Sequence, residues 1–259
     1  MSREPMPIDA LVATARAWID AAERVVVLTG AGISTDSGIP DFRGPQGVWT
    51  KNPGAEKMAT IQNYVAEPEV RKRSWQMRLE SKSWLAEPNA GHHAIVALEK
   101  RGKLEMLITQ NVDGLHLKAG TSPGRLVEIH GTLREVTCLS CGERAPMERA
   151  LARVRAGEAD PPCRSCGGIL KSATISFGQG LVPEDLRRAE RAASRADLML
   201  AVGSTLAVYP IAGVVPTAKH AGARVVILNA EPTAMDEMGD AVLRGSISDI
   251  LPRLVAADA

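Results

Sequence analysis

Five short segments of this chain are strongly apolar and have the length of buried strands. They are rich in Val, Ile and Leu, without the alternation that marks a strand with one solvated face. The five segments are Arg24–Thr29, Leu104–Thr109, Leu126–Ile129, Leu198–Val202 and Arg224–Leu228, with a weaker sixth at Ala241–Leu243. Continuous apolar runs of this kind predict strands that are covered on both faces.

Helical patterns separate these segments. Apolar residues recur at helical spacing from Ile8 to Ala22, and Pro183, followed by two acidic residues, starts a helix that we expect to run to Ala196. Helices that alternate with buried strands predict an α/β fold, a Rossmann-like, doubly wound parallel sheet with right-handed crossovers.

Two stretches interrupt this alternation. The first, 45–103, is helical in pattern, and the second, 132–177, holds all four cysteines. We expect a helical insertion and a zinc-binding insertion that together form a smaller domain. The large Rossmann-like domain then consists of 1–44, 104–131 and 178–259.

Composition excludes several classes of function. The chain has 259 residues, a net charge of +1 and 3% aromatic residues, so bulk charge or base stacking gives no reason to expect a nucleic-acid or anionic-membrane partner. No apolar run approaches the roughly 20 residues of a membrane helix. The first residues lack the features of a signal peptide, so we expect a cytoplasmic protein.

The first predicted strand runs into Gly30-Ala31-Gly32-Ile33-Ser34, a turn that lets backbone amides approach a pyrophosphate. The third glycine of the dinucleotide fingerprint is absent, with Thr35 in its place, and no acidic residue follows the second strand at the usual distance. A tight turn after a core strand is the alternative. Farther on, Phe42 could shield a reactive centre and Arg43 could bind phosphate, or they could be a core residue and a surface charge.

Polar and small residues follow the other predicted strands. In a parallel sheet the carboxyl ends of the strands meet at one edge, so we expect these residues in one crevice. They are Gln110, Asn111, Asp113, His130, Gly203, Ser204, Thr205, Asn229, Ala230 and Glu231. His130 could act as a general base on a sugar hydroxyl, or it could be a hydrogen-bonded core histidine. His92, His93 and His116 lie in helical patterns and are expected to be structural.

The cysteines form two pairs, Cys138-x-x-Cys141 and Cys163-x-x-Cys166, with 21 residues between them. This pattern is typical of a tetrahedral zinc site. Four thiolates leave no open coordination position, so the expected metal is structural. Disulfides and coincidence are the alternatives.

In combination, these motifs resemble the sirtuin family of NAD-dependent protein lysine deacylases, as a divergent bacterial-type member. The resemblance runs from Val25 to about Pro252. It is carried by 30–34, 37–43, 109–116, His130-Gly131, the cysteine pairs, 203–205 and 229–231. It implies a Rossmann-type large domain, and a small domain with a zinc module and a helical module.

The resemblance also implies roles. NAD is consumed: the acyl oxygen of a modified lysine attacks the nicotinamide ribose as nicotinamide leaves, and His130 assists a ribose hydroxyl as general base, giving free lysine and O-acyl-ADP-ribose. Asn111 and Asp113 position the ribose and the nicotinamide. The residues that the resemblance assigns to NAD are Gly30, Ala31, Gly32, Ser34, Asp41, Phe42, Arg43, Trp49, Gln110, Asn111, Asp113, Gly203, Ser204, Thr205, Asn229, Ala230, Glu231 and Ile247.

The chain departs from the family in the expected substrate region. Family members read Phe-Gly-Glu where this chain has Phe177-Gly178-Gln179, and they hold the substrate peptide as a strand between this segment and the one after Thr205. Val208 and Tyr209 would lie on the opposite wall.

A second departure concerns acyl preference. Members that remove acidic acyl groups carry Tyr-x-x-Arg, and here the best match is Trp75-x-x-Arg78. Arg78 could pair with a succinyl carboxylate, or Trp75 and Arg78 could be a core tryptophan and a solvated arginine. Alternative functions are a mono-ADP-ribosyltransferase and a catalytically weak NAD-sensing module. The incomplete fingerprint disfavours a dehydrogenase.

Overall fold

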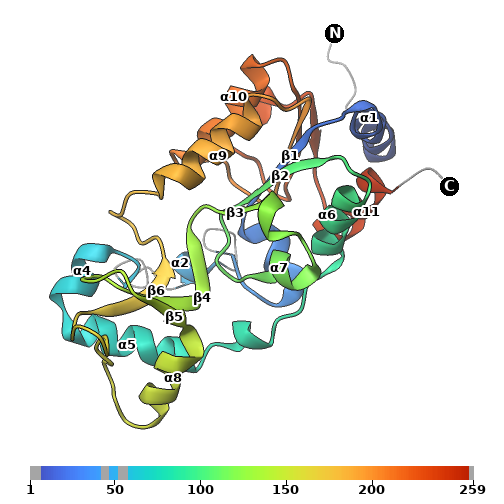
Figure 1. Cartoon of the computed structure of the whole chain (residues 1–259). Coiled ribbons are helices and arrows are strands. Elements are labelled where there is room, and N and C mark those ends of the chain that lie inside the picture. Colours follow the sequence, from blue (N-terminus) through green and yellow to red (C-terminus); the bar gives the residue numbers. More distant parts are fainter. Residues whose placement is uncertain (1–6, 42–46, 52–57, 257–259) are drawn as a thin grey trace.

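The computed structural model describes residues 7–41, 47–51 and 58–256, except for the side chains of Val48, Trp49 and Lys82. The larger part of the molecule is built on a six-stranded parallel sheet (Figure 1). Its strands lie in the order β3–β2–β1–β7–β8–β9. They are β1 (Val25–Thr29), β2 (Leu104–Thr109), β3 (Leu126–Glu128), β7 (Leu198–Val202), β8 (Arg224–Leu228) and β9 (Ala241–Leu243). All six predicted strands are confirmed.

Helices cover both faces of this sheet. Helices α1 (Ile8–Ala21), α6 (Ala90–Lys100) and α11 (Ile247–Val255) cover one face, and α9 (Pro183–Ala193) and α10 (Val214–His220) cover the other (Figure 1). Within β1, Val27 packs into the first core and Val26 into the second. Because successive side chains point to opposite faces, a strand between two helical layers needs an apolar residue at every position.

Helix α6 is placed differently from the prediction. We expected it in the helical insertion, 45–103, but it packs on α11 and β2 and contributes Ile95 and Leu98 to the core of the large sheet. The predicted boundary at residue 103 is therefore wrong. An amphipathic stripe shows that a helix covers an apolar surface, but it does not show which surface.

A three-stranded antiparallel sheet forms the centre of the smaller part. Its strands lie in the order β5–β4–β6, and they are β4 (Gly131–Cys138), β5 (Arg144–Pro146) and β6 (Leu170–Thr174). Helix α8 (Met147–Arg155) packs on β4 and on α5 (Pro68–Leu79). Trp75 of α5, fully buried, joins the core that these elements share. Trp75 is therefore a core residue, which is one part of the alternative given above for Trp75 and Arg78.

Short elements complete the described chain. They are η1 (Ala31–Ser37), α2 (Val48–Lys51), α4 (Ile61–Ala66), η2 (Lys82–Leu85), α7 (Leu115–Ala119), η3 (Pro123–Arg125), η4 (Ile211–Gly213) and η5 (Asp236–Met238). None of the helices described has the length and apolar character needed to cross a membrane.

Candidate active site

A cavity of about 1650 Å³ lies where the carboxyl ends of the central strands meet the small sheet. The strand order reverses between β1 and β7, which is where a doubly wound sheet opens a crevice for ligands. The predicted residues that line the cavity are Gly30, Ala31, Gly32, Asp41, Arg78, Gln110, Asn111, His130, Phe177, Gly178, Gly203, Ser204, Thr205, Val208, Tyr209, Asn229, Ala230, Glu231 and Ile247.

Five other residues predicted to bind NAD remain. Ser34 and Asp113 do not line the cavity and lie behind it, bonded to each other. Phe42 and Arg43 lie outside the described residues, as does the side chain of Trp49, whose backbone is part of α2.

The floor of the cavity is made by two backbone turns in direct contact. The Gly32 N–H donates to the Gly203 carbonyl oxygen at 2.8 Å. A Cβ atom on Gly30 would lie 2.7 Å from that same oxygen. Gly203 itself has a φ of +64°. Glycine is required here because the turns after β1 and β7 approach backbone to backbone, which leaves main-chain groups exposed to a ligand.

The turn after β1 continues as the 3-10 helix η1 and ends at Gly38, whose φ is +81°. Asn89 holds η1 in place: its side-chain amide donates to the Ile33 carbonyl oxygen at 2.8 Å and to Ser37 Oγ at 3.0 Å. The sequence shows Asn89 only as a suitable cap for α6, which it also is. Its contacts with η1, more than 50 residues away, were not predicted.

Asn111 and Asp113 are fixed by a shared hydroxyl group. Ser34 Oγ donates to Asp113 at 2.8 Å and accepts from the Asn111 side-chain amide at 3.1 Å. That amide also donates to the Gly30 carbonyl oxygen at 3.1 Å. Asn111 therefore faces the cavity in a fixed orientation, and Asp113 supports it from behind. Burial raises the pKa of Asp113, against the opposing hydrogen bonds from Leu115 and Ser34.

The tautomer of His130 follows from its hydrogen bond. Its Nδ1 lies 3.0 Å from the carbonyl oxygen of Gln110. A carbonyl oxygen only accepts, so Nδ1 carries the proton and Nε2 keeps its lone pair. Burial lowers the pKa of His130, although the bond to Gln110 opposes this. The imidazole is therefore neutral at neutral pH, which is the form a general base needs.

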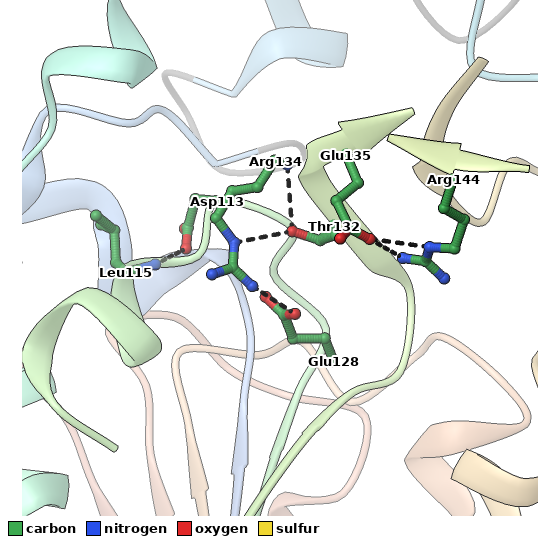
Figure 2. Close-up of polar contacts among 7 residues, drawn as sticks. All are labelled: Asp113, Leu115, Glu128, Thr132, Arg134, Glu135 and Arg144. Carbon is green, nitrogen blue, oxygen red and sulfur yellow. Dashed lines mark hydrogen bonds and ion pairs between the residues drawn. The ribbon is translucent and has the colours of Figure 1, made fainter. Parts of the chain in front are cut away.

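Behind this site, Arg134 of β4 connects the small sheet to the end of β3 and to the turn after Asp113 (Figure 2). Its Nη2 donates to Glu128 at 3.1 Å, and its side chain lies against Gly114, where a Cβ would be 2.8 Å from Arg134 Cδ. Burial raises the pKa of Glu128, and the Arg134 charge opposes this increase. Glu135 and Arg144, also drawn in Figure 2, form an exposed pair between β4 and β5.

The ends of β7 and β8 offer neutral polar groups. The Gln110 side-chain amide donates to Ser204 Oγ at 2.9 Å, which ties the end of β2 to the end of β7. The Asn229 side-chain amide donates to the carbonyl oxygen of Glu231 at 2.7 Å and shapes the turn after β8. Ile247 begins α11 at the same rim.

The predicted substrate residues line the other end of the cavity. Phe177 is 41% exposed and Tyr209 is 68% exposed. The Phe177 N–H donates to the Ala59 carbonyl oxygen, and the Phe177 carbonyl oxygen accepts from the Ile61 N–H. This edge of the segment is therefore already paired. Tyr64, Lys171 and Ile175 also line the cavity, and sequence reasoning missed all three.

The four cysteines lie together at the tip of the small sheet. Their sulfur atoms are all within 4.8 Å of one another. The Sγ–Sγ distance is 3.5 Å between Cys138 and Cys166 and 3.8 Å between Cys141 and Cys163. A tetrahedron with Zn–S bonds of about 2.3 Å has edges of about 3.8 Å. The predicted ligand set therefore fits one zinc ion, with no position left for a substrate.

Comparison with known proteins identifies the family. The sequence model of the Sir2 family matches residues 30–210, which include the glycine turn, His130 and all four cysteines. The chain belongs to the Sir2 family. The predicted sirtuin resemblance is thereby confirmed.

Relatives within the Sir2 family are similar over nearly their whole length. NAD-dependent protein deacetylase 2 of Streptomyces coelicolor is 50% identical over 231 residues, which are 89% of this chain and 96% of that protein. NAD-dependent protein deacylase 2 of Pyrobaculum aerophilum is 41% identical over 230 residues, 89% of each protein.

Solved Sir2 structures share the fold. A structure from work on the mechanism and regulation of Sir2 enzymes superposes with a TM-score of 0.86 at 38% identity, over 95% of this chain and 97% of the other. A complex of Sir2 with a p53 peptide and NAD+ superposes with a TM-score of 0.83 at 31% identity, over 96% of this chain and 97% of the other. The Rossmann-like architecture with a small cysteine-bearing part is confirmed.

Proposed function

We propose that this chain removes acyl groups from lysine side chains of proteins and consumes NAD in the reaction, giving nicotinamide and O-acyl-ADP-ribose. The observation that carries the proposal is the tautomer of His130, whose Nε2 keeps its lone pair. His130 lines the same cavity as the glycine turns after β1 and β7. The names of the relatives support it, since they are NAD-dependent deacetylases and deacylases. No finding favours the ADP-ribosyltransferase, the NAD-sensing module or the dehydrogenase.

The chain's own groups suit this reaction. NAD bound here would supply a glycosidic bond whose cleavage releases nicotinamide. Gly203, Ser204 and Thr205 would hold the phosphates, and Asn229 and Glu231 would bind the adenosine ribose. His130 would accept a proton from a ribose hydroxyl at Nε2. Asn111, held by Ser34, would position the nicotinamide and its ribose.

The remaining NAD contacts rest on the resemblance to sirtuins. We propose that Asp41, Phe42, Arg43 and Trp49 belong to the segment that covers the bound NAD, and that the backbone at Ile247 contacts adenine. A covering segment would keep water away from the reacting atoms.

The peptide would bind as an added strand across the exposed end of the cavity, between Phe177–Gly178 on one wall and Val208–Tyr209 on the other. Related Sir2 structures contain a p53 peptide and a propionylated peptide. The Ala59 and Ile61 backbone already pairs with one edge of Phe177, so we propose that the peptide uses the opposite edge.

The test is turnover of NAD with acetyl-, succinyl- and long-acyl-lysine peptides, followed by mass spectrometry. We expect nicotinamide and O-acyl-ADP-ribose in equal amounts. His130→Ala should lower kcat by about 10²–10⁴-fold, since it removes the general base. His93→Ala, at an exposed position on α6 outside the cavity, is the matched control and should leave kcat unchanged.

Each alternative function predicts a different product. ADP-ribose attached to a peptide would indicate a transferase, and NADH would indicate a dehydrogenase. NAD binding without turnover would indicate a sensing module. Near-normal kcat in His130→Ala would contradict the proposed base.

A further inference from the structure

The first turn of α6 contacts two elements that line the cavity, although its own residues do not line it. Gly91 shows this contact, because a Cβ there would lie 3.2 Å from Ile33 Cγ1 and 3.1 Å from Ile247 Cγ2. Ile33 belongs to η1, which continues the glycine turn after β1, and Ile247 begins α11, which packs beside α6 (Figure 1). The start of α6 therefore lies between the glycine turn and the proposed adenine contact.

The side-chain amide of Asn89 connects α6 to η1 in one defined orientation. Its Oδ1 accepts from the Gly91 N–H at 2.9 Å and caps α6. Its Nδ2 donates to the Ile33 carbonyl oxygen at 2.8 Å and to Ser37 Oγ at 3.0 Å. Because a donor lies next to Oδ1 and a carbonyl acceptor lies next to Nδ2, the two atoms cannot be exchanged. Both ends of the amide are therefore used.

Helix capping alone does not explain an asparagine at this position. A cap needs one side-chain oxygen, which Asp or Ser supplies as well as Asn does. The Nδ2 group of Asn89 adds nothing to the cap, and both of its hydrogen bonds go to η1. Asparagine is required here because one side chain both caps α6 and donates to η1.

The 3-10 helix η1 transmits this contact to the active site. Asn89 reaches the third residue of η1, Ile33, and its last residue, Ser37. Ser34, between them, accepts a hydrogen bond of 3.1 Å from Asn111. A 3-10 helix has poorer hydrogen-bond geometry than an α-helix, so contacts from outside contribute more to its position. The residues of η1 that line the cavity are Ala31, Gly32, Thr35 and Asp36.

We propose that Asn89 is a positioning residue for NAD, which holds η1 in the arrangement that NAD binds. This inference rests on the proposed function and deepens it. Asn89 does not line the cavity, so it acts through η1. Without the Nδ2 donor, NAD itself would have to bring η1 into place, and the cost would appear as weaker NAD binding. The proposed peptide walls at Phe177 and Tyr209 belong to other segments, so peptide binding would not change.

Asn89→Asp separates the two roles of the side chain. The carboxylate keeps a capping oxygen for Gly91, and it places an oxygen atom instead of a donor opposite the Ile33 carbonyl oxygen. Asn89→Ser also keeps a capping oxygen, but its side chain is shorter and we expect it not to reach η1. The dissociation constant for NAD, measured by isothermal titration calorimetry, should rise about tenfold in both variants, since up to two hydrogen bonds are lost. The kcat at saturating NAD should change less than this.

Three controls separate positioning of NAD from a general effect on the fold. The dissociation constant for an acyl-lysine peptide, measured without NAD, should stay within about twofold of the wild-type value in both variants. Urea unfolding gives their stability: a residue that only stabilised the fold would lower the free energy of unfolding and leave the NAD affinity of the folded protein unchanged. His93→Ala, at an exposed position on the same helix, should change neither dissociation constant.

The outcomes separate this role from the proposed function. Unchanged NAD affinity in Asn89→Asp and Asn89→Ser would overturn the positioning role, even if the wild-type chain removes acyl groups. NAD binding without turnover, weakened in both variants, would support the positioning role and overturn the proposed deacylation. A wild-type chain that does not bind NAD would overturn both.

Ser37→Ala tests the same contact if the Asn89 variants do not fold. It removes one of the two acceptors of Asn89 Nδ2, and Ser37 does not line the cavity. We expect the dissociation constant for NAD to rise about threefold, as for the loss of one hydrogen bond. An unchanged value in this variant would then overturn the proposal.

Discussion

Three glycines that line this cavity are required because two backbone turns contact each other there, and not because a loop has to be flexible. Gly30, Gly32 and Gly203 come from turns that are far apart in sequence, and each would place a Cβ within 2.7 Å of the other turn. The sequence indicated that these glycines let the backbone approach a phosphate. The structure shows in addition that the backbones of the two glycine turns contact each other. The ligand-binding surface is therefore also a packing surface.

Replacing Gly203 with alanine tests the contact between the two glycine turns. Its φ of +64° disfavours any side chain, and a Cβ would lie 2.5 Å from the Ile33 backbone nitrogen. We expect Gly203→Ala to lower the free energy of unfolding by about 2 kcal/mol or more and to weaken NAD binding. Gly213→Ala, where a Cβ meets nothing within 4 Å and the backbone is helical, should leave NAD binding unchanged and should not lower the free energy of unfolding. Urea unfolding and NAD titration measure both, and equal behaviour of the two variants would contradict the backbone-contact argument.

Secondary-structure elements differ in how well the sequence predicts them. The strands were predictable because they lie between two layers of helices, which requires apolar residues at most of their positions, as in the fully buried β7. Helix α6 was assigned to the wrong part because its stripe fits either core. The contact between Arg78 of α5 and Ser172 of β6 was not predicted, because these residues are 94 positions apart and are brought together only by the fold. Local patterns do not record such contacts.

The element that holds the cysteines gives a second prediction. Cys138 ends β4, and the N–H groups of Ser140 and Cys141 point at its sulfur atom, at 3.4 and 3.5 Å. We expect Cys138→Ser to lose zinc and to expose the small sheet to proteolysis, since structural zinc supplies folding energy. Ser140→Ala keeps four thiolates and should keep one zinc per chain by elemental analysis. Native protein that contains no zinc would contradict the site.

Two buried histidines connect the six-stranded sheet to helices α6 and α7 beside the active site. His92 of α6 and His116 of α7 have ring centroids 4.8 Å apart. Thr29 Oγ1 donates to Thr109, so it accepts from His116 Nε2, and His116 Nδ1 is left without a proton. His92 Nδ1 lies 3.3 Å from the Asn89 backbone nitrogen and 3.1 Å from Asn89 Oδ1, and its Nε2 is buried without a partner among the described residues. Burial favours the neutral form of both rings.

This arrangement should make the stability of the chain depend on pH. Burial lowers the pKa of His92 to about 4 and that of His116 to about 3, whereas both titrate near 6.5 in the unfolded chain. The unfolded state therefore binds more protons below pH 6.5. The contribution of the pair to the free energy of unfolding is fully present above pH 6.5 and is lost as the pH falls toward 4, by up to about 1.4 kcal/mol per pH unit for each histidine.

His116→Gln should have a lower free energy of unfolding at pH 7.5 but should lose less of it between pH 6.5 and pH 4. His220→Gln, at an exposed position on α10, should keep the wild-type slope. Urea unfolding, monitored by circular dichroism across this pH range, measures how the free energy of unfolding depends on pH. Parallel curves for His116→Gln and the wild-type chain would show that these histidines do not control the acid stability of the fold.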